Sequence, residues 1–373
     1  MKKRCIIFIC AFVCFLFPLQ VNASDTTDLL DEFHFEELDI LMEEIFPKEK
    51  MTFSKTLEAL IQGDFTNAFS VIKEMFLDQL FYELENSKGS VVQLIIVIIA
   101  STLFSQISGA FKSKNVAETG FLISYMMMLT ICLNNFRILA EATTNNVMRI
   151  VEFMKLLGPV YFFAITIATG SSSSLTFYHL LLILIFLVEL LVLNLLVPIA
   201  QLYLLIRILG EFSPDVPLSK FAEFLETIIK WTIKTLTGAV IGINLIQGML
   251  APAIDSVKRS ILTKGGQSIP IIGNLVGGTT EIILGTAVLI KNGIGVVGMI
   301  ACLGVCIGPI IQIAVSSLMY QFAAAIMQPV SDKRMVNCLS GMATSAKLLL
   351  KIVVTTGMIF MLMIAVVSTT TGV

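Results

Sequence analysis

Residues 175–206 read LTFYHLLLILIFLVELLVLNLLVPIAQLYLLI and hold one charged residue, Glu189. The run is 32 residues long, whereas an upright helix crosses the bilayer core with about 20 residues. Pro198 divides the run, so the pattern predicts two crossings, a broken helix or a re-entrant pair. Residues 292–328 leave the same alternatives open, because they carry no charge and are divided by Pro309.

The composition extends this membrane signature to the whole chain. Of its 373 residues, 56% are hydrophobic and 14% are charged, which is too little polar surface to coat soluble domains of this length. Apolar runs long enough for helical spans recur along the sequence. We therefore expect an all-α, polytopic membrane protein with six to eight crossings, whose further spans lie at residues 91–111, 121–136, 231–250 and 348–367.

The N-terminus differs from these spans. Three cationic residues at positions 2–4 precede an apolar run of 13 residues at 5–17, and a small-residue site ends at Ala23. Such a core is short for a span and is typical of a secretory signal peptide. Residues 1–23 are therefore predicted to be a cleaved signal peptide, with a retained anchor as the alternative.

Residues 24–90 are then expected outside the cytoplasm. They hold 16 Asp and Glu residues against 5 Lys residues. Aromatic and aliphatic side chains recur there at helical spacing, namely Phe65, Phe69, Ile72, Phe76, Leu80 and Leu84. This acidic helical segment is expected either to pack on the multi-pass membrane domain, residues 91–373, or to dock a partner outside the membrane.

Two proline-bounded units within the membrane domain indicate an internal duplication. Pro159 and Pro270 each open an apolar stretch rich in Ser or Gly, and Pro198 and Pro309 follow them after 39 residues each. Paired segments interrupted by Gly and Pro are typical of duplicated membrane proteins around a site or pore. With a period of 111 residues, the predicted repeat units are residues 120–230 and 231–341, followed by a final span at 348–367.

Four stretches between the spans have the pattern of amphipathic helices, which lie in the membrane interface or seal against neighbouring subunits. An apolar stripe faces away from charged residues at 146–157, 217–230, 254–264 and 331–347. Their cationic residues, notably Arg149, Lys258, Arg259, Lys333 and Arg334, are expected at lipid head groups. Membrane lipid and self-association are therefore predicted interactions.

The candidate functional residues are polar groups and helix breakers inside apolar runs. A charge in hydrocarbon is costly and usually marks a polar pathway or a partner. For Glu189 and Glu281 we consider three roles: lining a pore or cavity, contacting another subunit, or lying close to the membrane interface. For Gln201 and Gln312 the alternative to a functional role is a hydrogen bond between helices. The candidate pore and packing set is Pro159, Glu189, Pro198, Gln201, Pro270, Gly277, Gly278, Glu281, Pro309 and Gln312.

Enzymatic signatures are missing from the sequence. It has two histidines and no Cys-x-x-Cys, Walker A, GxSxG or HExxH pattern. His34 stands alone among carboxylates, and Cys302 and Cys306, one helical turn apart, are interpreted as packing residues. We expect no catalytic residue, no cofactor, no metal and no nucleic-acid partner.

The second proline-bounded unit carries a family resemblance. Its motifs are IPIIG at 269–273, LIKNGIGV at 289–296 and AAAIMQP at 323–329. In these motifs the chain resembles the stage III sporulation protein AE family of endospore-forming bacteria. The likeness extends from about residue 50 to the C-terminus, and its most specific part lies between Pro270 and Pro329.

This resemblance implies a protein made in the mother cell from the stage III A operon and located in the membrane that surrounds the forespore. It implies as partners the other proteins of that operon and stage II sporulation protein Q, with which such proteins form a secretion-like channel or feeding tube. The ATPase and ring-forming subunits are separate polypeptides in that system, which agrees with the missing nucleotide-binding motif here.

The sequence therefore predicts a non-enzymatic membrane subunit of the channel between mother cell and forespore, required for forespore development. Segments 159–174 and 270–285 are expected to meet at a pseudo-symmetric centre, and residues 24–90 to face the space between the two forespore membranes. The alternatives are a self-contained permease for a small solute and an assembly scaffold without a conduit of its own.

Overall fold

The computed structural model describes residues 35–45, 52–61, 66–110, 114–169, 174–212, 218–266 and 277–370. Of these residues 97% are helical and none is in a strand, which confirms the all-α prediction. The predicted signal peptide at residues 1–23 lies outside the described residues, and so do His34 and Pro270.

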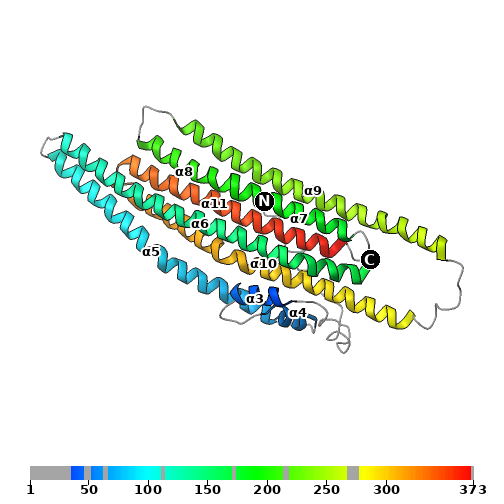
Figure 1. Ribbon diagram of the computed structural model, residues 1–373. Helices are drawn as coiled ribbons and strands as arrows, with labels where there is room; N and C mark the ends of the chain where they lie inside the picture. The colour runs from blue at the N-terminus through cyan, green and yellow to red at the C-terminus, as the bar shows by residue number, and fades with distance from the viewer. Residues whose placement is uncertain are drawn as a thin grey trace.

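Two short helices, α3 (Glu36–Ile45) and α4 (Phe53–Ile61), lie against a bundle of long rods (Figure 1). The rods are α5 (Thr66–Ala110), α6 (Lys114–Thr169), α7 (Ser174–Leu191) continued by the π-helical turn η2 (Val192–Leu196) and α8 (Val197–Phe212), α9 (Ser219–Gly266), α10 (Gly277–Met327) and α11 (Lys333–Thr370). Successive rods run in opposite directions. The 56 residues of α6 correspond to about 84 Å, well beyond the roughly 30 Å of a hydrocarbon core.

Within the described residues, five helices are long and apolar enough to cross a membrane. They are Ile72–Leu103, Glu118–Ala168, Tyr178–Gly210, Gly285–Met327 and Lys333–Val367. These segments contain or overlap all the predicted spans but one, the span predicted at residues 231–250. That segment is helical within α9 but is not among the five, and the side chains of its last four residues are outside the described set. The chain is thus a polytopic helical membrane protein.

The expected amphipathic helices are fused to the neighbouring spans. Residues 121–136 and 146–157 both belong to α6, and residues 333–347 of the stretch 331–347 belong to α11 together with residues 348–367. The reason is local: the nine residues from 137 to 145 contain neither Gly nor Pro, so nothing ends the helix between the two segments. The rods are consequently longer than the separate elements suggested by hydropathy.

The helices are not broken where the prolines suggested. α6 runs through Pro159 and α10 through Pro309, so two crossings or a re-entrant pair do not form at residues 277–327. Pro309 has no N–H for the carbonyl of Val305, and Asn146 of α6 supplies the missing donor, with its Nδ2 2.7 Å from that oxygen. A side chain of the neighbouring helix α6 therefore replaces the backbone hydrogen bond that Pro309 cannot make.

Pro198 is accommodated differently. The turn η2 precedes it, and the N–H of Val197 donates to the carbonyl of Val192, five residues back. One extra residue in the turn avoids the clash that a proline ring makes with the preceding turn. Residues 174–212 are thus a single rod with one π-helical turn. Of the three alternatives above, this is closest to the broken helix, although the chain stays helical throughout.

The predicted boundary at residue 90 is not a structural break, because α5 continues from Thr66 to Ala110. The N-terminal helices pack on the bundle: Phe35 stacks on Phe53 with ring centroids 5.4 Å apart, and α4 meets α10 at Gly293. A Cβ on Gly293 would lie 2.6 Å from Cδ1 of Leu57, so a larger residue there would force the Leu57 side chain to move. Asp39 fixes α3 to the start of α4 by accepting hydrogen bonds from the N–H and hydroxyl of Ser54, at 2.8 and 2.5 Å.

The apolar stripe of α5 divides between packing and exposure. Ile72, Leu80 and Leu84 pack against Ile307, Ile311 and Val315 of α10. Phe76 of the same stripe is 46% exposed. Packing on the membrane domain, one of the two alternatives, thus accounts for most of the described part of the stripe.

Close approach by glycine also joins the central rods. A Cβ on Gly298 of α10 would lie 2.8 Å from Leu157 of α6, and one on Gly357 of α11 would lie 2.7 Å from Sγ of Cys306. Small residues let helices in membrane proteins pack closely. The internal duplication stays a prediction, since Pro270, which anchors the second unit, lies outside the described residues.

Candidate functional site

The candidate residues on the α7–α8 rod lie at the bundle surface. Glu189 is partly exposed, and its carboxylate Oε2 is 3.3 Å from Nζ of Lys155 on α6. Pro198 and Gln201 are exposed. Glu189 therefore takes part in an ion pair between two helices and does not line a closed cavity within one chain.

The candidate residues on α10 are less fully described. Pro309 and Gln312 are half-buried, whereas Gly277, Gly278 and Glu281 lie in the first turns of α10 with side-chain surroundings outside the described set. Leu157 of α6 contacts Gly298, and Gly298 is 11 residues from Pro309, or about 16 Å along a helix. Pro159, two residues after Leu157, and Pro309 thus lie at different levels of the bundle.

Five charged residues follow one another along the exposed side of α6. We name Arg137, Glu141, Arg149, Glu152 and Lys155 the α6 charged row; all five are exposed. Nε of Arg137 is 2.7 Å from Oε1 of Glu141, and Lys155 pairs with Glu189 as described above. The opposite side of the helix is buried, as the amphipathic pattern of residues 146–157 predicts, through Val147, Ile150, Val151, Met154 and Leu157.

The contacts of α6 fix the level of this row in the bundle. Asn146 reaches Val305 of α10, and Val305 is next to Cys306, which meets Gly357 of α11. Further along, the hydroxyl of Tyr161 donates to the carbonyl of Ile364 on α11 at 3.4 Å. Residues 146–161 of α6 therefore run beside residues 357–364 of α11.

At this level α10 and α11 carry no charge. Residues 292–327 and 352–373 contain no Asp, Glu, Lys or Arg, whereas Arg149, Glu152 and Lys155 of α6 lie beside them. A charged side chain at the centre of a lipid-facing helix costs roughly 2.5–3.5 kcal/mol on insertion scales. At this depth α10 and α11 therefore suit a hydrocarbon environment, whereas the exposed side of α6 does not.

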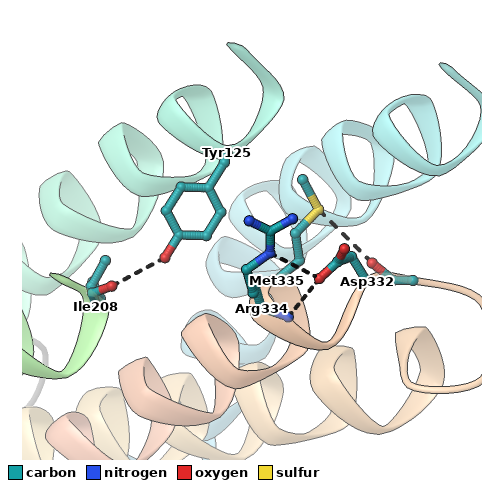
Figure 2. Close-up of polar contacts among 6 residues, drawn as sticks. Tyr125, Ile208, Asp332, Arg334 and Met335 are labelled. Atoms are coloured by element: carbon teal, nitrogen blue, oxygen red, sulfur yellow. Dashed lines mark hydrogen bonds and ion pairs between the residues drawn. The ribbon is translucent and has the colours of Figure 1, made fainter. Parts of the chain in front are cut away.

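A second group of polar contacts joins the first part of α6 to the end of α8 and to the start of α11 (Figure 2). The hydroxyl of Tyr125 donates to the carbonyl of Ile208 on α8 at 3.2 Å. The guanidinium of Arg334 lies 3.9 Å from the ring centre of Phe121 and its Nε 3.4 Å from Oδ1 of Asp332. Arg334, expected at lipid head groups, is thus held by groups of its own chain.

The surface of α9 is cationic where the span at 231–250 was predicted to begin. Trp231 is 74% exposed beside Lys230, which pairs with Glu226. Nearer the start of the helix, Nζ of Lys220 is 2.8 Å from Oε2 of Glu223, and this hydrogen bond and charge raise the pKa of the lysine. Lysines and tryptophan together are typical of the boundary between head groups and hydrocarbon.

Two features of the site were missed by sequence reasoning. Lys291 of α10 is fully buried, and its signal was available, since it is the single charged residue between positions 282 and 331. The hydrogen bond from Asn146 to Val305 had no signal, because it depends on which helix packs against the turn before Pro309. Among the described residues, no three His, Cys, Asp or Glu side chains gather closely enough to hold a metal ion.

Comparison with known proteins places this bundle in a family. The family model described as Stage III sporulation protein AE matches residues 51–371. The chain belongs to the stage III sporulation protein AE family. The match includes every described helix from α4 to α11, and with them the α6 charged row.

A curated relative supports the same assignment. Stage III sporulation protein AE of Bacillus subtilis (strain 168) is 23% identical over 318 residues, which cover 84% of this chain and 79% of the relative. No solved structure matches the chain. The two matches thus agree on the family of sporulation proteins, and α3 lies before the region that the family model matches.

Proposed function

We propose that this chain is a non-enzymatic membrane subunit of a secretion-like channel between the mother cell and the forespore, required for forespore development. The observation that carries this proposal is the family match over residues 51–371, which includes all the long rods. In this proposal the chain sits in the mother-cell membrane around the forespore, and the acidic segment, residues 24–90, is extracytoplasmic.

The proposed partners are the other proteins of the stage III A operon and stage II sporulation protein Q. Two features of the bundle support work within an assembly. The long rods expose large apolar side chains over much of their length, and the α6 charged row is exposed beside uncharged helices. A bilayer suits the first surface and not the second, so a subunit with further protein or water on one side accounts for both.

The test combines deletion with co-purification. Loss of the gene should stop the maturation of engulfed forespores, and the tagged chain should purify from sporulating cells with membrane proteins of the same operon. Normal maturation without the gene would refute the proposal. A chain that transports a small solute when reconstituted alone, with transport abolished by Glu189→Gln, would identify a permease instead. Full function after charge removal throughout the α6 charged row would favour the scaffold.

A further inference from the structure

The two sides of the bundle differ in polarity at a single depth. The α6 side exposes Met148, Arg149, Glu152 and Lys155 next to residues 357–364 of α11. At a similar depth α11 exposes Met358, and α7 exposes Ile183, Phe186 and Leu190, at 60, 61 and 45%. These apolar side chains lie close to the depth of Glu189, which pairs with Lys155 across the boundary between the two sides.

Lysines on α9 and α11 mark one edge of the apolar zone. Glu226 of α9 and Arg207 of α8 both lie within electrostatic range of Tyr203 of α8, and Cγ of Arg207 lies 2.9 Å from where a Cβ on Gly341 of α11 would be. Glu226 and Gly341 are therefore at similar levels. Since α9 and α11 run in the same direction (Figure 1), Lys234 and Lys351, 8 and 10 residues further on, are also nearly level.

Beyond these lysines both helices lose their charge. Residues 235–254 of α9 and residues 352–373 at the end of the chain contain no Asp, Glu, Lys or Arg. Each run is about 20 residues, the length that crosses the hydrocarbon core. The lysines thus stand where head groups would be, and the depth of Arg149, Glu152 and Lys155 falls inside the hydrocarbon layer that α9 and α11 define.

We infer that the exposed side of α6 borders an aqueous passage at hydrocarbon depth, whereas α7, α9 and α11 face lipid. The inference rests on the proposed channel role and assigns one face of the subunit to the conduit. Charges of both signs are present, two cationic and two anionic when Glu189 is counted with Arg149, Glu152 and Lys155. Such a wall suits hydrated solutes without selecting strongly for one sign of charge.

Two methionines give a matched test of this assignment. Met148 on α6 is 52% exposed and Met358 on α11 is 46% exposed, and both lie beside the contact between Asn146, Val305 and Gly357. Single variants Met148→Cys and Met358→Cys are made in the full chain and treated, in membranes of sporulating cells that hold the whole assembly, with a membrane-impermeant thiol reagent. The four described native cysteines are buried, which keeps the background low.

The expected result is labelling of Met148→Cys at least about tenfold faster than Met358→Cys, because a thiol in water ionises to the reactive thiolate and a thiol in lipid does not. Equal labelling of both would place this part of the bundle outside the bilayer, and protection of both would show the α6 side sealed by lipid or protein. Either result overturns the inference. Glu152→Cys and Phe186→Cys form a second pair should one of the first variants fail to accumulate.

The labelling result is separable from the fate of the proposed function. A chain that labels only on α6 but is dispensable for forespore maturation would keep the aqueous face and lose the channel role. A chain that is essential and co-purifies with its partners but labels on neither side would keep the role and place the passage elsewhere.

Discussion

α6 and α11 lie side by side yet distribute charge in opposite ways along the same axis. α11 carries Lys333, Arg334, Lys347 and Lys351 in its first half and no charge afterwards, whereas α6 is uncharged from residue 119 to 136 and then bears its charged row. Both helices start at the same end of the bundle (Figure 1). Depth alone thus does not decide which residues meet lipid; the side of the bundle decides as well.

The largest expected effect comes from placing the same negative charge on each of the two helices. Met358→Glu should destabilise the membrane-inserted chain by about 2.5–3.5 kcal/mol, because the new carboxylate faces lipid. Met148→Glu, with a similar exposed fraction and Arg149 as its neighbour, should cost far less. Thermal unfolding in lipid nanodiscs measures both, and equal losses would show that α6 and α11 share one environment.

A second prediction concerns the junction that sets the two helices level. Gly298→Leu should cost about 2 kcal/mol of stability, since its side chain would collide with Leu157 of α6 and Ile364 of α11. Gly238→Leu on α9 is the control, because nothing lies within 4 Å of a Cβ there. The same unfolding measurement applies, and a Gly298→Leu chain as stable as its control would mean that the contact is not close.

The hydrogen bond at the proline of α10 gives a smaller effect with a built-in rescue. Asn146→Leu should cost about 1 kcal/mol because the carbonyl of Val305 loses its donor in a buried site. Pro309→Ala restores a backbone N–H to that carbonyl, so in its presence Asn146→Leu should cost little. A double-mutant cycle reports the coupling, and strictly additive effects would contradict the repair of the helix by Asn146.

The smallest expected effect concerns the ion pair between Lys155 of α6 and Glu189 of α7. Glu189→Gln or Lys155→Gln should change stability by less than about 1 kcal/mol if water reaches the pair, as at a protein surface. A loss of about 3–5 kcal/mol is the result expected for a pair closed off from water. Unfolding of both single variants and of the double variant distinguishes the two environments.

Sequence reasoning recovered the elements whose signal is local. Helical class and apolar spans follow from composition and run length, and the amphipathic pattern around Val147 and Met154 correctly gave the buried side of α6. The interruption considered at Pro309 did not form, because the cost of a proline depends on what its neighbours donate. That neighbour, Asn146, is 159 residues from Val305 in the chain.

The candidate site was recovered only in part for a similar reason. Glu189 stood out as a charge within an apolar run, but its partner Lys155 belongs to a segment that reads as ordinary amphipathic helix. The importance of the α6 charged row comes from its level beside α11, and a level is a property of packing. No residue of the row differs by type from those of a solvated helix.

The π-helical turn before Pro198 has a consequence for alignment of the two proposed repeat units. An extra residue in one turn sets the angular position of the following residues back by about 100° relative to an unbroken α-helix. α10 has no such turn between Gly277 and Met327. Gln201 and Gln312, which match in sequence spacing, are therefore out of phase around their helix axes, in keeping with an exposed Gln201 and a half-buried Gln312. Equal spacing along the chain does not give equal azimuth in the fold.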